Sequence, residues 1–166
     1  MSFKLLFVAG LAALTLAAPL MAQNIAITDA YARVARPNAP TGAAFMMIEN
    51  LGPGDDRLIG VSSPVAERVQ LHTHFENEMG IMKMIHVKDG FALPTGMILM
   101  LERGGNHVMF MGLNQPFEHD AVIPVTLSFE KAGDIEIDVT VDLDRKPDES
   151  HGNGEMNHNQ MDHSSD

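Results

Sequence analysis

Apolar and polar residues alternate in short runs along most of this chain, with the period of two that is typical of half-buried β-strands. From Ile135 to Asp142, for example, every second residue is aliphatic and the residues between are polar. The strands predicted in this way are residues 25–35, 43–49, 57–63, 66–74, 80–87, 97–102, 107–113, 122–130 and 134–143. Turn clusters at 50–55 and 102–106 punctuate them, and no segment keeps a helical period. The pattern predicts an all-β fold, an antiparallel sandwich or barrel with Greek-key connections.

The N-terminal end departs from this alternation. Lys4 precedes an apolar run from Leu5 to Leu16, and small residues lead to Ala22. This order is typical of a secretory signal peptide, with a retained N-terminal anchor as the alternative. We therefore expect residues 1–22 to be a signal peptide, residues 23–146 to form one domain, and the mature chain to lie in the periplasm without membrane insertion.

The composition changes again after Lys146. Residues 147–166 hold five carboxylates and no Lys or Arg. The candidate ligands in this tail are His151, Met156, His158, Met161 and His163. With little that is apolar, the tail is expected to be disordered in the absence of a ligand. Its His content favours metal binding, with Cu(II) at the imidazoles as one option and an acidic, solubilising tail as the alternative.

The residue types of the whole chain narrow the choice of metal ion. There are 13 Met, 8 His and no Cys. Imidazole and thioether without thiolate are suited to copper, above all to the soft Cu(I) ion, whereas blue-copper electron carriers use a Cys thiolate. The net charge of −11 repels nucleic acid and anionic lipid, so neither is expected as a partner.

The candidate copper ligands of the predicted domain occur as pairs two residues apart. These pairs are His72 with His74, Met82 with Met84, and His107 with Met109. A short polar turn at residues 75–79 is expected to connect the strands of the first two pairs. Residues i and i+2 of a strand lie on one face, about 7 Å apart, so both members of a pair can lean toward one ion. A plausible site takes one residue from each of the first two pairs and both residues of the third.

Other His and Met residues are interpreted as structural. A single strand Met usually fills space in a core, and a single strand His is usually hydrogen bonded. This interpretation covers Met46, Met47, Met97, Met100, His86 and His119.

Several short motifs together resemble a known family, the periplasmic PCuAC copper chaperones, over nearly all of residues 24–143. The motifs are residues 41–45, 49–50, 55–58, 69–72, 80–84, 93–96 and 104–109. The resemblance implies a cupredoxin-like β-sandwich with a motif of His, ten residues, Met, twenty-one residues and His-x-Met. It implies that Cu(I) is bound by His72, Met84, His107 and Met109.

This chain departs from that motif, because its two gaps hold eleven and twenty-two residues. Extra residues in the turns, near 76–79 and 88–90, would leave the ligands undisturbed. An extra residue within a strand would turn the ligand to the other face, and His74 or Met82 would then be the alternative ligand.

The expected function is that of a copper carrier, not of an enzyme. The resemblance implies delivery of Cu(I) to a cuproenzyme, the CuA centre of cytochrome c oxidase subunit II. A periplasmic copper buffer without a dedicated client is the alternative, and so is a sandwich that uses its Met and His residues only for packing.

Overall fold

The computed structural model describes residues 24–146, and ten strands make up its regular structure. The strands are β1 (Ile25–Arg33), β2 (Thr41–Asn50), β3 (Asp56–Ser62), β4 (Ala66–Glu76), β5 (Met82–His86), β6 (Phe91–Leu93), β7 (Ile98–Leu101), β8 (His107–Leu113), β9 (Val122–Phe129) and β10 (Gly133–Val141). The expected all-β fold is confirmed, and no helix in the described range could cross a membrane. The predicted signal peptide and the predicted His/Met tail lie outside the described residues.

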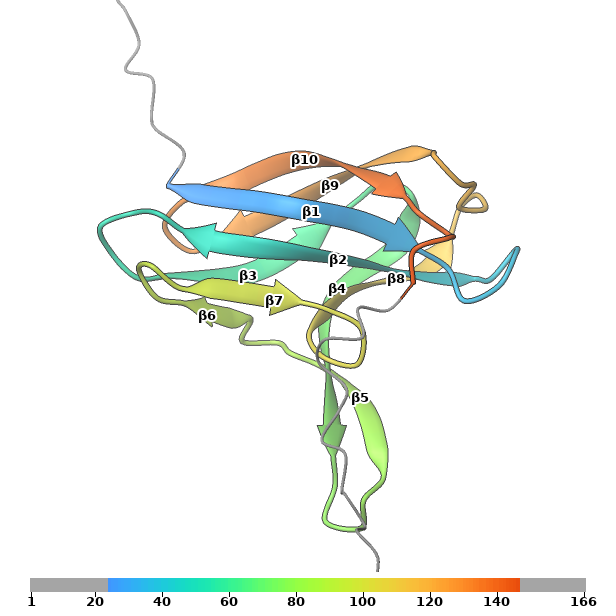
Figure 1. The fold of residues 1–166 in the computed structure, drawn as a ribbon, viewed down its shortest axis with the longest axis horizontal. Helices are drawn as coiled ribbons and strands as arrows, with labels where there is room; N and C mark the ends of the chain where they lie inside the picture. Colours follow the sequence, from blue (N-terminus) through green and yellow to red (C-terminus); the bar gives the residue numbers. More distant parts are fainter. Residues whose placement is uncertain (1–23, 147–166) are drawn as a thin grey trace, which may run out of the picture.

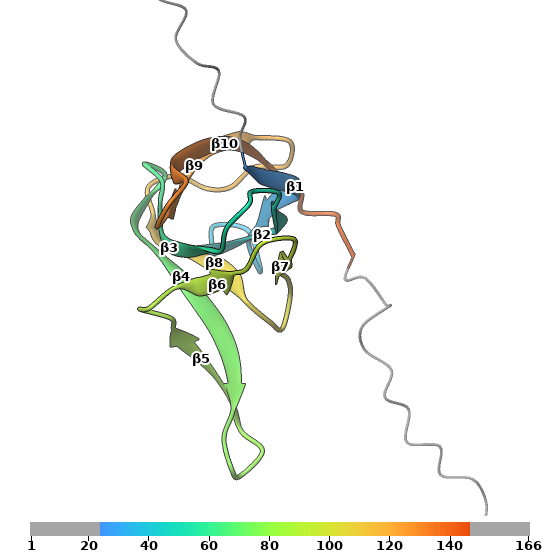
Figure 2. The ribbon, with the colours of Figure 1, turned by 90° about the vertical axis from the view of Figure 1, so that its left-hand side faces the viewer.

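The strands follow one hydrogen-bonded path, in the order β5-β4-β8-β2-β1-β10-β9-β3-β6, while β7 pairs with β2 (Figure 1). Strands that are neighbours on this path are often distant in the chain, as β8 and β2 or β9 and β3 are, which reflects Greek-key crossovers. The path bends around a common interior (Figure 2). The strand β2 pairs with β8 along its first half and with β7 along its second half.

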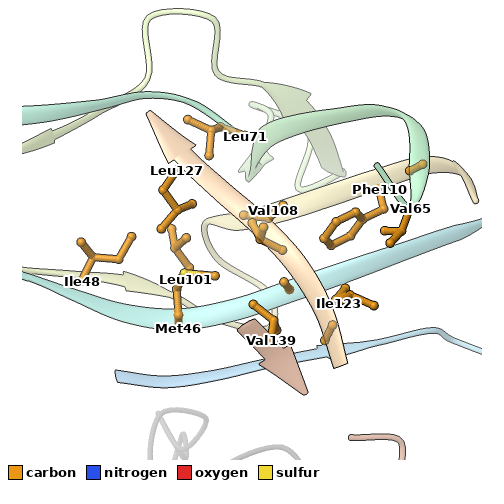
Figure 3. Packing of buried hydrophobic residues seen from close by; sticks show 14 of the residues in the cluster. Met46, Ile48, Val65, Leu71, Leu101, Val108, Phe110, Ile123, Leu127 and Val139 are labelled. Atoms are coloured by element: carbon orange, nitrogen blue, oxygen red, sulfur yellow. The ribbon is translucent and has the colours of Figure 1, made fainter. Parts of the chain in front are cut away.

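Apolar side chains at every second position of the strands point inward and fill the interior. Val108 and Phe110 of β8 and Leu71 of β4 point inward, where they meet Leu127 and Ile123 of β9 in one buried cluster (Figure 3). Because side chains alternate across a strand, burying Val108 and Phe110 places the residues on either side of them on the outer face. The core thus fixes which face of β8 carries His107 and Met109.

One strand pair differs from the antiparallel expectation, because β1 and β10 run parallel, with Tyr31 opposite Thr140. The register of β1 against β2 shifts between Thr28 and Tyr31, where Asp29 adopts a φ of 53°. Such a bulge bends and twists the strand, which lets β1 pair with β10 as well as with β2. The periodicity of either strand alone does not carry this information.

The hairpin of β4 and β5 extends away from the body of the sandwich (Figures 1 and 2). The strand β4 continues to Glu76 and β5 begins at Met82, so the turn expected at residues 75–79 begins two residues later and lies at 77–81. Asn77 holds that turn, since its side-chain oxygen accepts the backbone N–H groups of Met79 and Ile81. The expected strand at 80–87 is shorter, and the three residues of β6 were not predicted at all.

Candidate metal centre

The candidate ligands lie on the outer face of three neighbouring strands. His72 and His74 come from β4, Met84 from β5, and His107 and Met109 from β8. The strand β4 stands between the other two, with β8 on one side and β5 on the other. Residues far apart in the sequence are therefore brought together by the register of two antiparallel pairs.

That register distinguishes the two histidines of β4. His74 lies directly opposite Met84, whereas His72 lies opposite His86 on one side and His107 on the other. The ring centroids of His74 and His107 are 5.3 Å apart, and those of His72 and His107 are 5.9 Å apart. Both β4 imidazoles are thus close to His107.

A pocket of about 160 Å³ opens at this place. Four of its lining residues are candidate ligands, namely His74, Met84, His107 and Met109. Phe45 and Arg103 contribute further walls, and Phe45 is nearly buried beside the His107 ring, at a centroid distance of 6.3 Å. His107 itself is only 2% exposed, while Met84 on the hairpin is 45% exposed. The pocket therefore has a buried imidazole at its base and a solvent-accessible thioether at its rim.

Hydrogen bonds set the tautomer of His107. Its Nδ1 lies 3.0 Å from the carbonyl oxygen of Gly105, which can only accept, so Nδ1 carries the proton. The Nε2 atom then holds a lone pair, and it is buried without a hydrogen-bond partner in the described range. A ring that donates one N–H to a backbone carbonyl and keeps the other nitrogen free is oriented as metal-ligating histidines are.

The β4 histidines have a similar arrangement. Nδ1 of His74 lies 3.3 Å from the same Gly105 oxygen, which leaves its Nε2 as the available nitrogen. Nε2 of His72 lies 3.1 Å from the side-chain oxygen of Gln70, which leaves its Nδ1 buried and without a partner. A buried polar atom without a hydrogen-bond partner requires an explanation. A bound ion would explain both the Nε2 atom of His107 and the Nδ1 atom of His72.

The electrostatics favour the neutral form of His72 and His107. Burial lowers the pKa of His72, and the nearby rings of His107 and His86 lower it further. Burial also lowers the pKa of His107, aided by His74 and partly opposed by the hydrogen bond to Gly105. A neutral imidazole is the form that binds a metal, so these shifts favour ligation at neutral pH.

Within residues 24–146, no group of three or more His, Cys, Asp or Glu side chains could hold a metal ion. A metal at this pocket therefore depends on the thioethers of Met84 and Met109. Sulfur ligands that are neutral and soft, combined with imidazole, suit Cu(I) rather than Zn²⁺ or Mg²⁺.

Several predicted roles are changed by the structure. The alternative ligand Met82 lies opposite Glu76, further out along the hairpin than Met84, and outside the pocket lining. Met97 and Met100, expected to pack, are 56% and 38% exposed, whereas Met46 is buried as expected. The tail ligands His151, Met156, His158, Met161 and His163 lie outside the described residues.

Sequence reasoning interpreted His86 as structural, and it missed Phe45 and Arg103 as lining residues. His86 stacks on His72 with ring centroids 5.8 Å apart. Phe45 lies on β2, which contacts β8 only in the folded chain, and Arg103 lies in the turn before β8, whose sequence does not predict that its side chain lines a pocket.

The fold is a PCuAC-type β-sandwich, as comparison with solved structures shows. The copper-bound PCuAC domain from PmoF2 is 27% identical, with a TM-score of 0.59 over 72% of this chain and 93% of that domain. The CuI-DR1885 structure from Deinococcus radiodurans is 28% identical, with a TM-score of 0.55 over 74% of this chain and 83% of that one. The cupredoxin-like fold expected from the resemblance is confirmed.

The model of one protein family, described as "Putative lipoprotein LpqE-like", matches residues 25–141, and the chain belongs to this LpqE-like family. A curated relative, "Putative lipoprotein Lxx21020" from Leifsonia xyli subsp. xyli (strain CTCB07), is 35% identical over 108 residues. That match covers 65% of this chain and 63% of the relative. The chain thus spans less than two thirds of the length of this relative.

Proposed function

We propose that the protein is an exported copper carrier that holds Cu(I) in the pocket of β4, β5 and β8. The observation that carries this proposal is the buried Nε2 lone pair of His107, which points to a ligand beside two thioethers in one pocket. The similarity to two copper-bound PCuAC structures supports it. We propose Met84, His107 and Met109 as three of its ligands, because all three line the pocket and the alternative Met82 does not.

The fourth ligand is one of the two β4 imidazoles. His72 has the buried, unpartnered Nδ1 and is the ligand that the family resemblance implies, whereas His74 lines the pocket opposite Met84. We propose His72 in the resting site, because an unpartnered buried nitrogen is the more costly feature to leave without a ligand. His74 then serves as the nearest exchange partner, since both rings lie within 6 Å of His107.

The difference in solvent exposure between the ligands suggests how copper passes from this site to an acceptor. Met84, on the projecting hairpin, is the accessible ligand, and His107 is the buried one. An acceptor's ligand would replace Met84 first and His107 last, so the ion is never released as a free species. We propose a periplasmic cuproenzyme as the acceptor, with the CuA centre of cytochrome c oxidase subunit II as the client implied by the family resemblance.

The ligand assignment is tested by methionine replacement. Met→Leu nearly conserves volume, so in a packing role it should lower the free energy of unfolding by less than about 1.5 kcal/mol and leave copper binding unchanged. As ligands, Met84→Leu and Met109→Leu should each weaken Cu(I) binding at least tenfold, or about 1.4 kcal/mol, in competition with a chromophoric Cu(I) chelator.

Met111→Leu is the matched control, because Met111 lies on the same face of β8 but outside the pocket lining. Wild-type affinity in both ligand variants would refute the site. Loss of affinity in His74→Gln but not in His72→Gln would transfer the fourth ligand to His74.

Transfer needs its own assay. Copper-loaded protein is mixed with an apo CuA domain in the presence of a chelator that traps free Cu(I). The domain is then separated and oxidised with ferricyanide, and the absorbance of the oxidised CuA centre is recorded. Loading that survives the chelator indicates direct transfer. Copper that remains on the donor, or that reaches only the chelator, would favour the buffer function instead.

A further inference from the structure

A second, larger pocket adjoins the candidate metal centre. Its volume is about 440 Å³, and it shares Ala43, Phe45, Arg103 and Met109 with the smaller pocket. Arg33, at the end of β1, is its second basic wall. Met109 thus forms part of the partition between a pocket rich in His and Met and a pocket that carries two guanidinium groups.

These two arginines converge on one atom. The guanidinium groups of Arg33 and Arg103 donate to the carbonyl oxygen of Arg145, at 3.4 Å and 2.5 Å. Within residues 24–146 no carboxylate lies within ion-pair distance of either group, although the chain carries 22 acidic residues. The Nε of Arg103 is also buried without a hydrogen-bond partner in this range. Two clustered cations with spare donors indicate a missing anionic partner.

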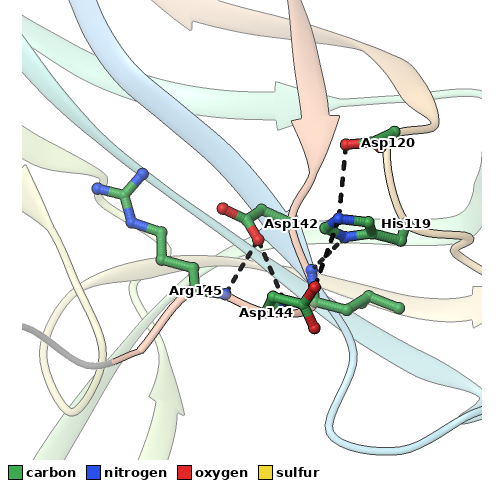
Figure 4. A network of polar contacts seen from close by, with 6 residues as sticks. His119, Asp120, Asp142, Asp144 and Arg145 are labelled. Carbon is green, nitrogen blue, oxygen red and sulfur yellow. Dashed lines mark hydrogen bonds and ion pairs between the residues drawn. The ribbon is translucent and has the colours of Figure 1, made fainter.

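The chain leaves the described domain at the same place. After β10, the side chain of Asp142 accepts the backbone N–H groups of Asp144 and Arg145, and His119 accepts that of Leu143 (Figure 4). The guanidinium of Arg145 pairs with Asp29 and lies 4.1 Å from the centre of the Tyr31 ring. These contacts fix the exit of the chain beside Arg33 and Arg103.

We propose that this second pocket is the docking site for the acidic start of the tail, with Asp148 and Glu149 as the partners of Arg33 and Arg103. Asp148 lies only three residues beyond Arg145, so the chain can place its carboxylate anywhere within about 10 Å of the carbonyl that both arginines already contact. So short a connection adds little loop-closure entropy. The charges are complementary, since residues 147–166 hold five carboxylates and no Lys or Arg.

Docking there has a consequence for the neighbouring pocket. His151 follows Glu149 by two residues, or about 7 Å of extended chain, and Met109 lines both pockets. The docked tail therefore holds its first imidazole at the edge of the proposed copper site. The docking itself requires no metal, so it can be tested separately from the proposed function.

The test uses ¹⁵N-labelled, copper-free protein that carries its full tail, with the Arg Nε–H signals and the Gly42 amide as reporters. Asp148→Asn combined with Glu149→Gln removes the proposed partners, and Asp162→Asn combined with Asp166→Asn removes the same charge far along the tail. We expect the first double variant to shift the Arg33, Arg103 and Gly42 signals and the second to leave them unchanged. Because salt of about 1 M reduces the screening length to about 3 Å, it should move the wild-type signals toward those of the first variant.

Four results would overturn the proposal. Identical Arg33 and Arg103 signals in the wild type and the first variant would show that the pocket does not hold these carboxylates. Equal shifts in both double variants would indicate a general charge effect. Wild-type signals that depend on protein concentration would assign the pocket to the tail of a second copy. If the wild type bound inorganic phosphate as strongly as the first variant does, the tail would not fill the pocket.

Discussion

Replacing His107 by Leu should separate the copper site from the stability of the fold. In the copper-free protein the buried Nε2 of His107 has no hydrogen-bond partner, a feature that lowers the free energy of unfolding by about 1–3 kcal/mol. Leu removes this atom but also removes the Nδ1–H bond to Gly105, which contributes about 0.5–1.5 kcal/mol. The Gly105 oxygen keeps His74 as a donor at 3.3 Å, so it is not left unsatisfied.

The two effects leave a net stabilisation of the apo protein of about 1 kcal/mol, because the lost hydrogen bond is the smaller of the two. For a domain of this size that free energy corresponds to a rise in the thermal midpoint of roughly 4 °C. The Leu side chain would lie among the rings of Phe45, His72 and His74, an environment it can share without a polar requirement. Copper binding should meanwhile weaken at least tenfold.

Both quantities are measurable on one preparation, by thermal unfolding of the apo protein and by Cu(I) competition titration. His119→Leu is the control, because His119 accepts the backbone N–H of Leu143 in the network of Figure 4 and does not line the pocket. That variant should not gain stability and should bind copper normally. A midpoint that drops by several degrees in His107→Leu would refute the reasoning, since it would mean that the imidazole serves the fold.

Three further outcomes are expected. The folded-state pKa values of His72 and His107 lie below the unfolded value near 6.5, so the unfolded chain binds more protons between the two values. The stability of the apo protein should therefore fall as the pH drops below about 6.5. Denaturation midpoints that are equal at pH 7.5 and 5.5 would contradict this. Removing residues 147–166 should lower the copper stoichiometry to one, whereas equal stoichiometry with and without them would exclude the tail from metal binding. Gly90→Ala should destabilise the fold strongly, because a Cβ there would lie 2.0 Å from the Leu58 carbonyl oxygen at a φ of 69°, and an unchanged urea midpoint would disprove that account.

Much of this architecture is present in the sequence because side-chain alternation is a local property. The period of two located nine of the ten strands and placed the members of each candidate pair on one face. The apolar neighbours Val108 and Phe110 then determine that His107 and Met109 face outward. The absence of Cys and the abundance of His and Met indicate soft-metal chemistry without any knowledge of the fold.

The tertiary structure alone decided which of these faces meet. The parallel pairing of β1 with β10 follows from a bulge at Asp29, and the position of His74 opposite Met84 follows from a turn two residues later than the sequence indicated. Arg103 lies in the predicted turn at 102–106, but only the folded chain shows that its side chain lines the pocket. Alternation is set by each strand on its own, but register is set by the total burial and hydrogen bonding of strands that are distant in the chain, and a shift of one residue would reverse the face of every ligand.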